Sequence, residues 1–127
     1  LTGSYNRALA NDDRLELSVS VLRKDAGFEN SFDEYQVGVG YAVAEPILGV
    51  ELYTSLELGY REYEEFSTTL DGRRDRFVTA IAAATFQDIS YFGFSPNISV
   101  SASRTVSSAE ENTSSELQLL FGLTSNF

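Results

Sequence analysis

The chain has 127 residues, which is the size of a single domain, and a formal net charge of −10. It contains no cysteine and no histidine, which excludes disulfides, thiolate or imidazole catalysis and Cys/His metal sites. The acidic balance argues against a nucleic-acid partner, because phosphate backbones are bound by clustered lysine and arginine.

Alternation of apolar and polar residues predicts seven β-strands, and no segment keeps a helical period over three turns. The fifth strand is the least regular, because its alanine run 82–84 also suits a helix. We therefore expect an all-β chain. The predicted strands are Thr2–Leu9, Arg14–Lys24, Phe32–Ala44, Val50–Tyr63, Arg74–Phe86, Phe94–Val106 and Leu117–Phe127.

The last predicted strand has the length that a tilted strand needs to cross a bilayer, and it ends on an aromatic residue. This ending is typical of outer-membrane β-barrels, in which the assembly machinery reads an aromatic C-terminal strand. The predicted assembly signal is one face of this strand, Leu117, Leu119, Phe121, Leu123 and Phe127.

The connections alternate in length. Residues 10–13 and 45–49 form short turns, whereas residues 25–31, 64–73 and 107–114 form longer polar loops. Short inner turns and long external loops are typical of bacterial outer-membrane barrels. We therefore expect an antiparallel transmembrane barrel in the bacterial outer membrane, in contact with membrane lipid and lipopolysaccharide.

The same alternation places five charges of each sign on the polar side of the strands, with Lys24 among the basic ones. We expect a nearly neutral lumen with ion pairs across strands, and neither a cofactor nor an enzymatic activity. Arg23 and Arg104 break the pattern at outer strand ends, where lipid head groups or lipopolysaccharide phosphate lie in reach. The predicted lumen network is Arg14, Glu16, Glu34, Glu51, Glu57, Arg61, Arg74, Arg76 and Glu116.

Two questions stay open at this point. The run Arg73–Arg76 fits either an ion-pair cluster with Asp71 and Glu64 at the rim or a site for phosphate or cargo. Seven strands do not close a bacterial barrel, which uses even numbers from about eight upwards. Residues 1–127 are therefore expected to be the C-terminal portion of a larger barrel, to pair with another chain, or to hide an eighth strand, and the first is favoured.

Three segments carry a resemblance to a known family. Arg73-Arg74-Asp75-Arg76, Gly93-Phe94-Ser95-Pro96 with Arg104, and residues 119–127 resemble the end of the barrel domain of the surface lipoprotein assembly modifier (Slam) family. The resemblance covers the last part of the chain and implies a barrel of about fourteen strands. It also implies export of lipoproteins or secreted protein cargo across the outer membrane.

Two other functions remain as alternatives. One is a passive porin-like channel or structural barrel for small solutes, which needs the same strand pattern without a protein cargo. The other is a soluble lipid-binding β-barrel, in which the apolar residues would face inward.

Overall fold

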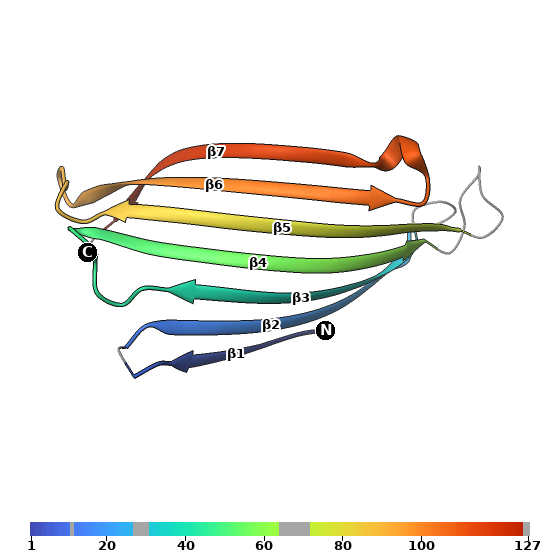
Figure 1. Ribbon diagram of the computed structural model, residues 1–127, viewed down its shortest axis with the longest axis horizontal. Coiled ribbons are helices and arrows are strands. Elements are labelled where there is room, and N and C mark those ends of the chain that lie inside the picture. Colours follow the sequence, from blue (N-terminus) through green and yellow to red (C-terminus); the bar gives the residue numbers. More distant parts are fainter. Residues whose placement is uncertain (11, 27–30, 64–71, 126–127) are drawn as a thin grey trace.

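The computed structural model describes residues 1–10, 12–26, 31–63 and 72–125. Seven strands form one antiparallel sheet in which each strand pairs with its neighbours in sequence (Figure 1). A short 3-10 helix, η1 (Glu110–Asn112), precedes the last strand. The chain is therefore all-β, as predicted. The strands are β1 (Thr2–Ala8), β2 (Arg14–Lys24), β3 (Phe32–Ala42), β4 (Val50–Tyr63), β5 (Arg73–Phe86), β6 (Phe94–Ser107) and β7 (Ser114–Ser125).

The strand bounds agree closely with the alternation in the sequence. β2 and β4 begin and end at the predicted residues, and β5 is a strand throughout its alanine run, so the helical alternative is wrong. β7 begins at Ser114 rather than Leu117, because Ser114 and Ser115 continue the pairing with β6. The predicted end of this strand, residues 126–127, lies outside the described residues.

The sheet is not closed in the part of the chain that the structure describes. There, β1 pairs only with β2, and β7 pairs only with β6. Each of these two strands therefore has one edge whose backbone groups face no partner strand. The antiparallel sheet confirms the coarse fold prediction, whereas closure into a barrel stays a prediction.

The continuous register divides the side chains between two faces, because residues directly opposite each other share a face. We call them the apolar face and the polar face. The apolar face includes Leu15, Leu17, Val19 and Val21 of β2, Tyr35, Val37 and Val39 of β3, Leu52, Leu56 and Leu58 of β4, Val78, Ala80 and Ala82 of β5, Ile98, Val100 and Ala102 of β6, and Leu117, Leu119, Phe121 and Leu123 of β7. The polar face includes Ser18, Ser20, Gln36, Gly38, Ser55, Glu57, Thr79, Ser99, Ser101, Ser103 and Gln118, with Leu22, Phe32, Phe77, Ile81 and Leu120 among its apolar exceptions.

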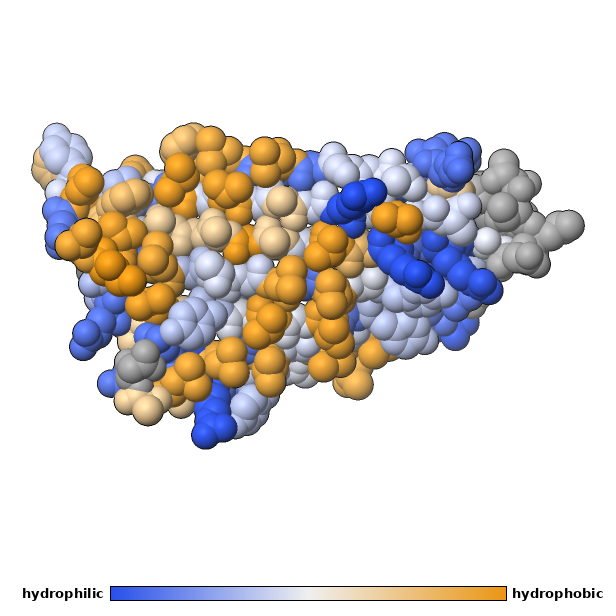
Figure 2. All heavy atoms as spheres, viewed as in Figure 1, coloured by the Kyte–Doolittle hydropathy of each residue, from blue (hydrophilic) through white to orange (hydrophobic). Residues whose placement is uncertain are grey.

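Burial is inverted relative to a water-soluble domain. Val37 and Leu58 on the apolar face are 52% and 50% exposed, and hydrophobic side chains spread over the sheet in Figure 2. Among the described residues the one buried hydrophobic side chain is Ala109, whereas Glu34, Asp75 and three other polar residues are buried. Side chains converge on the inner side of a curved sheet, so the less exposed polar face is the concave one.

Glycines lie where the polar face is most crowded. A Cβ atom added at Gly38 would lie 2.5 Å from Ser18 Oγ, and one at Gly122 would lie 2.7 Å from Asn97 Oδ1. At Gly59 it would collide with the ring of Phe77, the residue directly opposite on β5. These strand glycines let cross-strand side chains lie flat against the backbone, which relieves crowding on the concave side.

The two ends of the sheet differ in their connections. The connections 9–13, 43–49 and 87–93 lie at one end, which we call the turn end, and 25–31, 64–72 and 108–113 lie at the other, the loop end. The predicted contrast in length is smaller than expected, because β3 ends before Ala44 and β7 begins early. At the turn end, Leu48-Gly49 and Phe92-Gly93 form two-residue turns with positive φ at both positions.

Candidate functional site: the charged network of the polar face

Seven of the nine predicted network residues lie on the polar face, and two do not. Arg74 stands opposite Glu62 and Arg76 opposite Tyr60, which places both arginines on the apolar face. The prediction of which β5 residues lie on which face is therefore wrong; we call this assignment the phase of the strand. The error arises because Phe77, Thr79 and Ile81 share the polar face, so the apolar pattern of this strand is carried by alanines, Val78 and, at the strand end, Phe86.

Arg61 and Glu34 form the first ion pair of the network. They are direct cross-strand neighbours on β4 and β3, and both the Nε and Nη2 atoms of Arg61 donate to Glu34 Oε2. Gln36 Nε2 donates to the other carboxylate oxygen at 2.8 Å. The Glu34 side chain is 8% exposed. A buried carboxylate needs such partners, because desolvating an isolated charge is costly.

A second ion pair joins Arg73 and Asp75, two residues apart on β5. The bond is bidentate, with Arg73 Nε donating to Oδ1 at 2.9 Å and Arg73 Nη2 donating to Oδ2 at 2.5 Å. Asp75 is almost completely buried. Sequence reasoning missed this pair because Arg73 was assigned to the preceding loop, although the spacing of two already puts both residues on one face of a strand.

Aromatic rings hold the two ion pairs together at the loop end. The Arg61 guanidinium lies 4.6 Å from the ring centre of Phe32, and the Arg73 guanidinium lies 4.6 Å from that of Tyr63. Arg61 Nη1 also donates to the Tyr63 hydroxyl at 3.3 Å. The polar-face cluster is Phe32, Glu34, Arg61, Tyr63, Arg73, Asp75 and Phe77.

The other predicted network residues stay apart from this cluster. Glu16, Glu51 and Glu57 stand opposite glycine, threonine or asparagine, and Glu116 stands opposite Ser103. Neither these glutamates nor Arg14 forms an ion pair with another described residue. The polar face carries four basic and six acidic residues within its strands, so the predicted charge balance is wrong and this face is acidic.

The arrangement divides the polar face into a paired cluster near the loop end and separate glutamates elsewhere. The clustered charges are already paired, which fixes the shape of the polar face near the loop end. The separate glutamates give the polar face a negative potential at mid-strand and at the turn end, and a negative potential favours cations. Within the described residues no three acidic side chains gather as a metal site would require.

The predicted assembly signal lies on one exposed stripe. Leu117, Leu119, Phe121 and Leu123 all project from the apolar face of β7, the edge strand, and Phe121 is 75% exposed. Phe127 lies outside the described residues, as do Asp71 and Glu64 of the predicted rim cluster. The role of this stripe in assembly stays a prediction.

Comparisons with known proteins do not add a family to these observations. No protein-family model, curated protein or solved structure matches the chain. None of the helical segments in the described part is long and apolar enough to span a membrane.

Proposed function

We propose that this chain forms part of the wall of a bacterial outer-membrane β-barrel that transports substrates along its polar face. One observation carries the proposal: the apolar face is the more exposed of the two faces across β2 to β6. Leu17, Val39, Leu56 and Leu119 are 44%, 40%, 42% and 54% exposed rather than gathered in a dry centre. A contiguous apolar surface of this kind needs lipid or protein to cover it.

The height of the apolar face supports a membrane setting. On β4 it extends from Val50 to Tyr60, which is roughly 33 Å at about 3.3 Å per residue. A strand tilt of about 40° reduces this length to a height of about 25 Å, the thickness of the apolar band in outer-membrane barrels. Charged residues on this face, such as Arg23 and Glu62, lie near strand ends.

The open edges support a larger assembly. Each backbone N–H or C=O group left unpaired in hydrocarbon costs about 2 kcal/mol or more, so β1 and β7 need partner strands there. We propose that further strands complete the barrel, to about fourteen, with β7 pairing with the first of them. The alternative, pairing with another chain, would satisfy the same edges.

For the transported substrate, we propose lipoproteins or secreted proteins, which is what the resemblance to the Slam family implies. A passive porin-like channel is the second candidate, and the acidic, ion-paired polar face favours it as much as the first.

Planar-bilayer recordings of the full-length protein separate the two. A barrel that shows no conductance in these recordings, and that releases a co-reconstituted lipoprotein from proteoliposomes, supports protein transport. Steady conductance without cargo supports the channel and contradicts the first candidate.

A further inference from the structure

The basic residues are divided unequally between the two faces. All nine lie within strands, and five of them project from the apolar face, against two acidic residues there. The two acidic residues are matched: Arg23 pairs with Asp33, and Arg74 Nε donates to Glu62 at 3.0 Å. Apart from Arg7 near the turn end, this leaves Arg76 and Arg104, which form no ion pair with any described residue.

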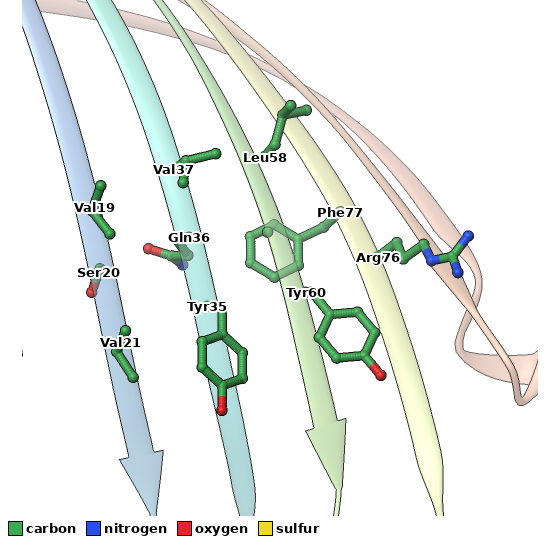
Figure 3. A pocket seen from close by; sticks show the side chains of 11 residues that line it. Val19, Ser20, Val21, Tyr35, Gln36, Val37, Leu58, Tyr60, Arg76 and Phe77 are labelled. Atoms are coloured by element: carbon green, nitrogen blue, oxygen red, sulfur yellow. The ribbon is translucent and has the colours of Figure 1, made fainter.

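Arg76 and Arg104 are neighbours on the apolar face at the loop end. Arg76 stands opposite Val106 on β6, and Arg104 stands opposite Val78 on β5, so the two arginines form a diagonal cross-strand pair. Diagonal neighbours are about 7–8 Å apart at their backbones, which long side chains bridge easily. In Figure 3 the Arg76 side chain extends from β5 away from β4, toward the side on which β6 pairs.

An apolar groove begins beside Arg76. It has a volume of about 580 Å³, and Val19, Val37 and Leu58 lie along it (Figure 3). Tyr35 and Tyr60 flank it, and both rings point toward the arrowheads of β2 and β4, which is the loop end. This groove is apolar along its length and ends in tyrosine hydroxyls and a guanidinium at the loop end. A membrane lipid has the same layout, with an apolar acyl chain that leads to a phosphate.

We infer that Arg76 and Arg104 bind the phosphate of an anionic membrane lipid whose acyl chain lies in this groove. Neither guanidinium has an ion-pair partner among the described residues, and a phosphate between them would balance both charges while accepting paired N–H donors from each. The phosphorylated sugar of lipopolysaccharide carries this chemistry at the outer leaflet. The inference rests on the proposed membrane placement and adds a specific lipid site to it.

Lipid binding to the full-length protein in neutral detergent micelles tests the inference. Native mass spectrometry would count bound lipid A, with dephosphorylated lipid A and inorganic phosphate as separate probes. The double variant Arg76→Gln/Arg104→Gln should bind lipid A about tenfold more weakly than the wild type. Arg14→Gln is the matched control, because Arg14 is a polar-face arginine without an ion pair to a described residue, and it should bind as the wild type does.

Three outcomes would overturn the inference: equal binding by the double variant, equal binding of the dephosphorylated lipid, or equal occupancy by inorganic phosphate alone. Flotation with phosphatidylcholine vesicles tests the membrane placement independently of the lipid site. A protein that floats with neutral vesicles but does not discriminate lipid A contradicts the lipid site alone. A protein that does not float contradicts the proposed function.

Discussion

At the scale of single residues, the register decides which charges meet. The spacing of Glu34 and Arg61 in the sequence says nothing about contact, since the pair forms only when β3 and β4 are aligned. Arg73 and Asp75, by contrast, were within reach of sequence reasoning, because a spacing of two on a strand places them on one face. Seven predicted network residues were placed on the right face, but only two of them belong to the cluster that forms.

The pairing of Arg61 with Glu34 predicts a thermodynamic coupling between them. Arg61→Ala should destabilise the folded protein by about 3 kcal/mol, because it leaves the buried Glu34 carboxylate without its cation. Glu34→Ala should cost less, because the Arg61 side chain is 32% exposed and keeps its hydrogen bond to the Tyr63 hydroxyl. The double substitution should cost clearly less than the sum of the two. Urea unfolding midpoints in vesicles measure this. Glu51→Ala, an exposed polar-face control, should change stability by less than about 0.5 kcal/mol, and additive effects of the pair would contradict the coupling.

At the scale of the elements, most of the strands were predictable because apolar and polar residues alternate along them, as they do from Leu15 to Val21 in β2. The phase of β5 was not. Alanine, threonine and single aromatic residues give little contrast between its faces, and only pairing with β4 places Val78 and Ala80 on the apolar side. Loop lengths were also less informative than expected, because pairing extends β7 into the predicted loop.

The corrected phase of β5 makes a direct prediction, which the absence of native cysteine allows to be tested cleanly. Single cysteines at Thr79, Ile81 and Ala83 should react with a water-soluble maleimide in vesicles, because these positions face the polar side. Cysteines at Ala80 and Ala82 should be protected until detergent is added. Labelling at Ala80 and Ala82 with protection at Thr79, Ile81 and Ala83 would contradict the corrected faces and support the assignment predicted from the sequence.

The apolar stripe of β7 makes a second prediction at this scale. Leu119→Arg and Phe121→Arg should block assembly, since an arginine facing lipid costs about 2–4 kcal/mol near mid-membrane. Gln118→Arg and Thr124→Arg lie on the polar face and should be tolerated. Heat-modifiable mobility on gels reports assembly. An equal loss of assembly in the apolar-face and the polar-face variants would contradict the assignment of one face of β7 to lipid.

At the scale of the whole molecule, the two faces of the sheet differ in charge as well as in hydropathy. All eleven charged residues in the connections are acidic, whereas the strands carry nine basic and eight acidic residues, so the net charge of −10 comes from the connections. The apolar face carries arginines near the loop end, and the polar face is acidic. Under the proposed membrane placement, the polar face lines the inside of the barrel and the apolar face meets lipid.

The most direct test uses tryptophan, which the chain lacks. Leu58→Trp places a single indole on the apolar face, and Glu57→Trp places one on the polar face of the same strand. In vesicles, brominated acyl chains should quench the fluorescence of the first strongly, whereas aqueous acrylamide should quench the second. Equal quenching of both by acrylamide, or protection of the Leu58→Trp indole from both quenchers, would contradict this placement of the two faces.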